Sequence, residues 1–305
     1  MKRLLLTGAS GFLGYNIAQL AREDWEVHGV VLSHPVAIPG VRIVRADLAF
    51  RGELGRLFRE IRPHAVIHTA AMPNANICQA HPDETSLINT RVPVEIAALC
   101  GDLGIDCVFT STDLVFDGRN APYGEDAPTS PVSVYGEQKV RAEEGMLECC
   151  PSALVCRMPL MFGDRGPASA SFLQPMFEAV REGREIKLFV DEFRTPASGE
   201  DAARGILLAL SSGGRGILHL GGPERISRYD FGLLLMEVFG VTGARLRACR
   251  QSDVPMAAPR PSDVSLDSSR AFRLGYRPDK IRDALERLAR RAAPFAKSPG
   301  SARNV

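Results

Sequence analysis

A tyrosine and a lysine four residues apart, Tyr135 and Lys139, are the residues of this sequence best suited to proton transfer. They fall in a predicted helix, where a spacing of four places both on one face about one turn apart. An ammonium group beside a phenol favours the phenolate and lowers a tyrosine pKa that is ordinarily about 10. Such a tyrosine can donate a proton to a developing alkoxide. The spacing alone is common in helices, so a surface pair without chemistry is the alternative.

A run of hydroxyl groups precedes this pair at the end of a predicted strand. The run is Thr110-Ser111-Thr112-Asp113. Open α/β sheets bind ligands at the carboxyl ends of their strands, so a hydroxyl here can hold a carbonyl oxygen beside Tyr135. A strand end, a hydroxyl and a Tyr-x-x-x-Lys helix together are far more specific than any one of them.

Three glycines follow the first predicted strand and open the first predicted helix. They are the glycines of TGASGFLG at residues 7–14. A turn without side chains lets backbone N–H groups approach a pyrophosphate, whose charge the helix N-terminus favours. An ordinary strand–helix turn is the alternative, but the position after an N-terminal strand favours dinucleotide binding. The residues expected to contact the cofactor here are Gly8, Ser10, Gly11, Phe12, Leu13 and Gly14.

The end of the second predicted strand bears on which dinucleotide binds. A carboxylate there would hold the ribose 2′-hydroxyl of NAD, whereas a basic group would accommodate the 2′-phosphate of NADP. The run is VVLSHP at residues 30–35, without a carboxylate. Ser10, Ser33 and His34 could donate hydrogen bonds to a phosphate, so the sequence favours NADP over NAD. An exposed loop histidine without a role is the alternative for His34.

Composition limits the class of protein. The 305 residues are 45% hydrophobic and 24% charged, close to an average globular protein. The 37 basic and 36 acidic residues give a net charge of +1, which gives no reason to expect a nucleic-acid partner. No apolar run approaches the ~20 residues that span a bilayer, so no membrane segment is expected. Seven cysteines without a framework spacing predict a reducing compartment, the cytoplasm.

Strands and helices alternate in the first half of the chain. The predicted strands are 3–6, 26–32, 41–45, 65–68, 107–110 and 153–157. The predicted helices are 13–22, 53–61, 85–100 and 131–149. Beyond residue 160 the pattern is irregular, with helices at 172–181 and 200–210 and strands at 186–190 and 216–220. The alternation predicts an α/β fold with a Rossmann-type, doubly wound parallel sheet.

These motifs together resemble the extended short-chain dehydrogenases/reductases, and most of all the dTDP-4-dehydrorhamnose reductases. The shared motifs are TGxxGxxG at 7–14, DL at 47–48, HTAA at 68–71, Asn89, STD at 111–113 and YxxxK at 135–139. The greatest similarity lies in STDLVFDG at 111–118 and PYGE at 122–125. The likeness is strong to residue 160 and looser afterwards, ending with RPSDVSLD at 260–267 and LGY at 274–276.

The resemblance implies NAD(P)H-dependent reduction of a 4-keto group on a nucleotide-linked sugar. Thr112, Tyr135 and Lys139 would be the catalytic triad, in which Tyr135 protonates the oxygen and Lys139 also binds the nicotinamide ribose. The other implied cofactor contacts are Asp47 and Leu48 beside the adenine, Ala70, Ala71 and Met72 along the phosphates and ribose, and Met158 near the nicotinamide. We expect an NAD(P)-binding domain of residues 1–160 and about 195–222. A smaller C-terminal substrate-binding domain would hold about 161–194 and 223–292, leaving a tail at 293–305.

Two stretches depart from the reductase pattern. After the sixth predicted strand the chain reads RMPLMFG at 157–163, where the reductases show an aromatic segment. The expected substrate loop reads DEFRTPAS at 191–198, in which Arg194 is a candidate partner for a substrate phosphate or carboxylate. A solvated arginine is the alternative. Asp113 is a second candidate substrate contact, and the departures leave the sugar and the nucleotide open.

Two other functions stay open. An epimerase or dehydratase of the same extended family would use its cofactor transiently, but dehydratases place acidic residues beside the active hydroxyl and here only Asp113 follows Thr112. A non-catalytic subunit resembling the regulatory subunit of methionine adenosyltransferase would bind NADP without turnover, which the intact triad disfavours. No metal site is expected, because His64 and His68 have no carboxylate or cysteine cluster to complete one. A homodimer is left open.

Overall fold

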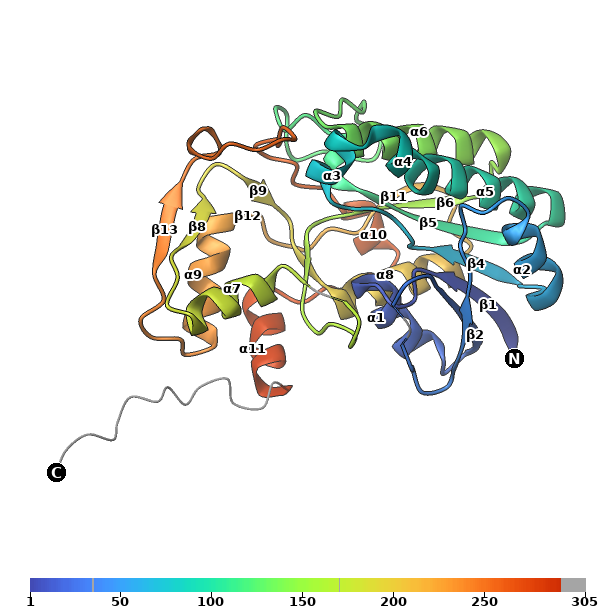
Figure 1. Cartoon of the computed structure of the whole chain (residues 1–305), viewed down its shortest axis with the longest axis horizontal. Coiled ribbons are helices and arrows are strands. Elements are labelled where there is room, and N and C mark those ends of the chain that lie inside the picture. Colours follow the sequence, from blue (N-terminus) through green and yellow to red (C-terminus); the bar gives the residue numbers. More distant parts are fainter. Residues whose placement is uncertain (35, 170, 292–305) are drawn as a thin grey trace.

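The computed structural model describes residues 1–34, 36–169 and 171–291. Its largest element is a seven-stranded sheet in the order β11-β6-β5-β4-β1-β2-β3, with every adjacent pair parallel (Figure 1). This confirms the predicted Rossmann-type α/β fold. The strands are β1 (Lys2–Thr7), β2 (Trp25–Val31), β3 (Val41–Arg45), β4 (Ala65–His68), β5 (Asp106–Thr112), β6 (Leu154–Met158) and β11 (Gly216–His219).

The direction in which the sheet grows reverses beside β1. From β1 the chain adds β2 and β3 on one side, and then returns to add β4, β5, β6 and β11 on the other. Loops that leave β1 and β4 therefore diverge at their carboxyl ends. Open α/β sheets bind ligands at such a reversal point.

Helices cover both faces of the sheet (Figure 1). On one face lie α1 (Phe12–Ala21) and α8 (Gly199–Ser211), whose apolar residues share a core with Leu4 and Leu6. On the other lie α2 (Glu53–Ile61), α5 (Val92–Leu103) and α6 (Val134–Cys149), packed on Leu5 and Val66. Strands covered on both faces are apolar throughout rather than alternating, which explains the short aliphatic runs of the sequence.

Two helices differ from their predicted bounds by more than one residue, each for a local reason. The helix expected at 131–149 begins at Val134, because the Ser133 side chain accepts a hydrogen bond from the Gly136 N–H and caps it there. The helix expected at 85–100 is a longer segment with an interruption. It consists of α4 (Pro82–Ser86), a π-helical turn η1 (Leu87–Arg91) and α5, which ends where Gly104 turns left-handed with φ +64°.

A second group of elements lies at the other end of the molecule (Figure 1). Here α7 (Leu173–Arg181), α9 (Arg228–Val238) and α11 (Ile281–Arg291) share an apolar core with the paired strands β8 (Ile186–Phe189) and β13 (Leu246–Cys249). The core includes Phe162, Phe231 and Leu285.

Short elements connect the two groups. Those after residue 160 are the pairs β7 (Met161–Phe162) with β10 (Ala197–Ser198) and β9 (Phe193–Arg194) with β12 (Ile226–Ser227), η3 (Gln251–Asp253), and α10 (Ser269–Arg273). Ala271 of α10 and the nearby Tyr276 belong to the α1 and α8 core. Before residue 160 there are also α3 (Ala75–Ala80) and the 3-10 turn η2 (Asp113–Val115). Within the described ranges, no helix is both long and apolar enough to cross a membrane.

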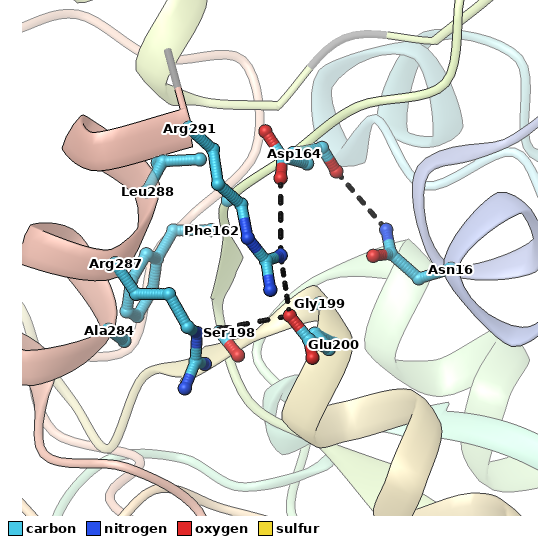
Figure 2. Close-up of a pocket in the computed structure, with 11 residues that line it drawn as sticks. Asn16, Phe162, Asp164, Ser198, Gly199, Glu200, Ala284, Arg287, Leu288 and Arg291 are labelled. Carbon is cyan, nitrogen blue, oxygen red and sulfur yellow. Dashed lines mark hydrogen bonds and ion pairs between the residues drawn. The ribbon is translucent and has the colours of Figure 1, made fainter. Parts of the chain in front are cut away.

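Helix α11 closes onto α8 through charged side chains. Figure 2 shows a small pocket at this junction, with Arg287 and Arg291 pointing toward Glu200 at the start of α8. The Arg291 guanidinium lies 2.9 Å from Glu200 and 3.7 Å from Asp164, and the Asp164 carbonyl accepts a hydrogen bond from Asn16 of α1. One helix therefore joins elements of both groups.

Candidate active site

The glycine turn between β1 and α1 is closely packed at Gly8 and Gly14. Gly8 has φ +71°, and a Cβ there would lie 2.7 Å from the Ala70 nitrogen. A Cβ on Gly14 would lie 2.1 Å from the Gly8 carbonyl oxygen, so α1 approaches the turn as only glycine permits. No side chain caps α1 at Gly11, which leaves the N–H groups of its first turn available to an anion. This cradle fits a dinucleotide pyrophosphate.

The ends of β2 and β3 lie beside this turn. The Ala9 N–H donates to the Val30 carbonyl at 3.1 Å, which brings the glycine turn against β2. Beyond β2, Ser33 and His34 are exposed, and their side chains are hydrogen-bonded to each other at 2.9 Å. Ser10 is half-buried. The hydroxyl groups and the imidazole are thus at one edge of the sheet, open to a ligand.

Beyond β3, two residues predicted to flank the adenine differ in exposure. Leu48 is buried in the core, whereas Asp47 is exposed and accepts a hydrogen bond from the Ala49 N–H at 3.0 Å. The Asp47 carboxylate therefore stabilises the turn that follows it and remains exposed to solvent.

The loop after β4 is held by a buried asparagine. Asn89, 1% exposed, accepts from the Met72 N–H at 2.8 Å and donates to the Met72 carbonyl at 3.1 Å. Its amide also donates to Gln138 Oε1 on α6 at 2.8 Å. Ala70 and Ala71 are half-buried and Met72 is 41% exposed. The sequence marked Asn89 as a shared motif residue but gave it no role, because the π-helical turn that carries it does not show in the sequence pattern.

A threonine and a histidine join the ends of β1 and β4. Thr7 Oγ1 and His68 Nδ1 are 2.6 Å apart, and the Thr69 hydroxyl donates to the Thr7 carbonyl at 2.7 Å. Burial, aided by the nearby Lys139 charge, lowers the pKa of His68 to about 3. The imidazole is therefore neutral, and it stacks against Phe109 of β5.

Lys139 is buried beneath the candidate site. Its Nζ donates to the Thr110 carbonyl at 2.7 Å and lies 3.9 Å from the centre of the Phe109 ring. The residue is 2% exposed. Burial lowers the pKa of Lys139 to about 7, although Glu143 opposes the shift. A buried ammonium is thus aimed at the carboxyl end of β5.

Tyr135 lies in the first turn of α6 and is 7% exposed. Its ring is in a small apolar cluster with Ala75, Cys78 and Ala258. The expected lowering of the phenol pKa is wrong for the protein alone: burial raises the pKa of Tyr135, and Cys78 and Asp113 add to the rise. Desolvation disfavours the charged phenolate. This effect outweighs the attraction of the Lys139 ammonium, which donates its hydrogen bond to the Thr110 carbonyl.

Thr112, at the end of β5, is adjacent to the first turn of α6. A Cβ on Gly136 would lie 2.3 Å from the Leu114 carbonyl, so α6 is held against the turn that follows Thr112. The Thr112 hydroxyl accepts from the Leu114 N–H at 3.2 Å and donates to Asp113 Oδ1 at 3.3 Å. The fold therefore gathers Thr112, Tyr135 and Lys139 at one edge of the sheet.

Arg194 is buried rather than open to solvent, at 5% exposure. Its Nε lies 3.4 Å from Asp113 Oδ2, and its Nη2 lies 3.3 Å from Glu192 Oε1. The direct contact with a substrate anion expected from the sequence is not what this geometry favours, because two of its donor atoms already face protein carboxylates. Burial raises the pKa of Asp113 to about 6, with Arg194 opposing the shift. Arg194 thus links β9 to the carboxyl group beside Thr112.

Met158 lies beside Thr112 at the carboxyl edge of the sheet. It pairs with Thr112 across β5 and β6 and is 3% exposed. The neighbouring Arg157 forms a buried ion pair with Glu143 of α6, 2.7 Å between Nη2 and Oε2. This pair ties α6 to β6 and so fixes the helix that carries Tyr135. In the part of the chain that the structure describes, no group of three or more His, Cys, Asp and Glu residues could hold a metal ion.

Comparisons with known proteins show which family and fold the chain shares. A family model described as the RmlD substrate binding domain matches residues 1–293. The methionine adenosyltransferase 2 subunit beta of Xenopus laevis is 30% identical over 283 residues, covering 90% of this chain and 83% of that protein. "Probable low-salt glycan biosynthesis reductase Agl14" of Haloferax volcanii is 29% identical over 269 residues, covering 87% and 89%. A dTDP-4-dehydrorhamnose reductase structure from Clostridium acetobutylicum superposes with a TM-score of 0.82 at 25% identity, covering 94% and 98%.

Proposed function

Because the chain belongs to the RmlD substrate binding domain family, we propose that it is an NAD(P)H-dependent oxidoreductase that reduces a keto group on a nucleotide-linked sugar. The resemblance to extended short-chain dehydrogenases/reductases drawn from the sequence is confirmed. The observation that carries the proposal is the meeting of Thr112, Tyr135 and Lys139 beside a glycine turn that fits a pyrophosphate.

The chain's own groups divide the reaction between them. When bound, the reduced nicotinamide supplies the hydride. Thr112 positions the carbonyl oxygen of the substrate, and the phenol of Tyr135 donates the proton that this oxygen takes up. A phenol whose pKa is raised by burial is fully protonated before the reaction, as a proton donor must be. The ammonium of Lys139 binds the nicotinamide ribose and favours the phenolate that remains.

The cofactor binds along the carboxyl edge of β1, β2, β3 and β4. Its pyrophosphate lies on the glycine turn, and NADP is preferred to NAD because the end of β2 carries no carboxylate. The contacts that we propose are Gly8, Ser10, Gly11, Phe12, Leu13, Gly14, Ser33, His34, Asp47, Leu48, Ala70, Ala71, Met72, Tyr135, Lys139 and Met158.

Beyond residue 160, the elements outside about 195–222 form the substrate side of the site. In this proposal residues 1–160 and about 195–222 bind the cofactor, and about 161–194 and 223–292 bind the substrate. Asp113 faces the substrate, and Arg194 acts through Asp113 because its guanidinium is already held between two carboxylates.

A substrate screen tests the activity. Purified protein is mixed with NADPH and a set of 4-keto nucleotide sugars, and the loss of NADPH absorbance is followed. Reduction of at least one of them is expected, and Tyr135→Phe should lower turnover by about 10²–10⁴-fold while NADPH affinity changes less than about twofold. Near-normal turnover of this variant would remove Tyr135 from the mechanism. A changed sugar without consumption of NADPH would indicate an epimerase or dehydratase instead.

A non-catalytic function is the second candidate, and the relatives named as subunits of methionine adenosyltransferase 2 favour it. A chain of this kind would bind the cofactor and a partner enzyme without turnover. Tight NADPH binding with no reduction of any keto sugar, together with co-elution with a methionine adenosyltransferase, would support it. The buried, intact Thr112, Tyr135 and Lys139 favour the reductase.

A further inference from the structure

Arg45 ends strand β3 at the edge where the proposed cofactor binds. The register pairs Arg45 with Val31, the last residue of β2. The same edge holds the glycine turn, because the Ala9 N–H donates to the Val30 carbonyl. Arg45 therefore lies across the end of β2 from the pyrophosphate cradle, although it is far from the glycines in sequence.

The guanidinium of Arg45 is held in place by one hydrogen bond and keeps other donors available. Its Nε donates to the Leu32 carbonyl at 3.1 Å, which holds the side chain over the segment carrying Ser33 and His34. Across residues 1–34, 36–169 and 171–291, this is the single hydrogen bond of the side chain, and no ion pair engages it. The residue is exposed, so both Nη groups are free to bind a ligand.

The chemistry of this corner suits a phosphate. A planar guanidinium can bind two phosphate oxygens at once, and the Ser33 hydroxyl and His34 imidazole add further polar groups. An Arg near the end of β2 is where a dinucleotide-binding fold accommodates a ribose 2′-phosphate. The neighbouring Arg42 does not compete, because its guanidinium lies 2.7 Å from Glu26.

We propose that Arg45 binds the 2′-phosphate of NADP and is the residue that sets the cofactor preference of this chain. This inference rests on the proposed function for the presence of a dinucleotide, but not for the reduction of a sugar. The guanidinium is supplied by the strand after the one that usually carries the determinant. Sheet register, rather than sequence proximity, brings it to the ribose.

Calorimetric titration tests the assignment without any turnover. The full chain is titrated with NADPH, NADH, 2′,5′-ADP and 5′-AMP, and so are Arg45→Gln and Arg42→Gln. Wild type should bind 2′,5′-ADP more tightly than 5′-AMP, and Arg45→Gln should weaken NADPH and 2′,5′-ADP by about 10- to 100-fold. NADH and 5′-AMP should change less than about twofold, since they lack the phosphate. Arg42→Gln removes the same charge from the same strand and should leave the preference intact.

Two further variants separate charge from folding. Arg45→Lys keeps the charge and should retain part of the preference, whereas Arg45→Glu should reverse it toward NADH. Equal binding of 2′,5′-ADP and 5′-AMP by wild type, or an unchanged preference in Arg45→Gln, would overturn the assignment. A failure to bind any of the four nucleotides would also overturn it, and would reject the proposal that the chain binds a dinucleotide cofactor. A clear NADPH preference without reduction of any keto sugar would reject the proposed reaction but still support the assignment of Arg45 to the 2′-phosphate.

Discussion

The burial of the Lys139 ammonium lowers the free energy of unfolding. An ammonium at 2% exposure is separated from water, and its direct partners are one carbonyl oxygen and the face of Phe109. A buried ammonium without a paired carboxylate lowers the free energy of unfolding in this way. The position of Lys139 one helical turn from Tyr135 is what a functional site predicts, because active sites hold groups in environments that stability does not favour.

Replacing Lys139 should therefore stabilise the cofactor-free protein in a pH-dependent way. At pH 6.5 Lys139→Met should raise the free energy of unfolding by about 1–4 kcal/mol. Between pH 7 and about pH 10 the folded wild type loses the Lys139 proton while the unfolded chain keeps it, so wild-type stability rises with pH and the difference shrinks. Urea denaturation across this pH range measures the effect.

The exposed Lys187 of β8 gives a matched control for that experiment. Lys187→Met removes the same charge from the surface and should change the free energy of unfolding by less than about 0.5 kcal/mol at every pH. A Lys139→Met difference that is constant with pH would mean that burial does not shift the lysine. Loss of stability at all pH values would mean that the contact with Thr110 outweighs desolvation.

Residue types and spacings predicted which side chains meet, but not their surroundings. The spacing of Tyr135 and Lys139 placed them on one helix face, which the structure shows. The spacing could not give the burial that raises the pKa of Tyr135 and lowers the pKa of Lys139. The burial of Tyr135 depends on α3 and on the segment around Ala258, which cover its ring. For the same reason Arg194 looked like a free cation until β9 was placed beside Asp113.

At the scale of elements, the sheet half of the chain was predictable because its strands are covered on both faces. The bounds of β3, β4 and α2 agree with the sequence expectation residue for residue. Helix α9 was missed, since it carries a run of consecutive apolar residues at 233–236 in place of a helical repeat. Part of that run packs on the second core while Leu233 is 45% exposed, so tertiary contacts decide its conformation.

The π-helical turn between α4 and α5 has a consequence for the loop after β4. One extra residue in a helical turn redirects the side chains that follow, and such turns recur at functional sites. Here it carries Asn89, which bonds both backbone groups of Met72 and the side chain of Gln138. The turn therefore holds the proposed phosphate–ribose path against α6.

Converting that asparagine to a carboxylate should loosen the loop. Asn89→Asp keeps an acceptor for the Met72 N–H but loses the donors to Met72 and Gln138, leaving a buried charge among oxygens. We expect the free energy of unfolding to fall by about 2–4 kcal/mol, and NADPH to bind more weakly at temperatures where the variant is folded. Thermal denaturation and calorimetry measure the two effects.

Asn74→Asp is the control, because Asn74 caps α3 only by accepting from the N–H groups of Asn76 and Ile77. A carboxylate accepts those bonds equally well, so stability should change by less than about 0.5 kcal/mol. Equal effects of the two substitutions would show that the donors of Asn89 are unimportant.

At the scale of the whole molecule, two separate cores must keep a fixed relation for the proposed cofactor and substrate to meet. The sheet core and the core around Phe231 are joined by short strand pairs and by α11. Helix α11 packs its apolar face on the second core, while its Arg287 lies 3.8 Å from Glu200 of α8 (Figure 2). Arg287 also lies 3.6 Å from Asp201 of α8 and pairs with Asp279. The sequence pattern had no means of pairing residues so far apart.

Removing Arg287 should weaken this junction more than its surface position suggests. Asp201 is almost fully buried at the start of α8 and also accepts from the Ser198 hydroxyl, so Arg287→Met would leave its charge short of a partner. We expect a loss of about 1–3 kcal/mol in the free energy of unfolding, measured by urea denaturation. Because the carboxylate is shielded from ions, most of the loss should persist in 0.5 M salt.

Arg290→Met tests whether the effect belongs to the buried contact or to any arginine of α11. Arg290 is 71% exposed and lies 3.9 Å from Glu286 on its own helix. An exposed pair of this kind contributes about 0.3–0.5 kcal/mol, and salt should abolish the contribution. Similar losses for both variants, or a loss for Arg287→Met that vanishes in salt, would mean that general surface charge, and not the contact with Asp201, holds α11 against α8. The two cores would then be joined mainly through the short strand pairs, β7 with β10 and β9 with β12.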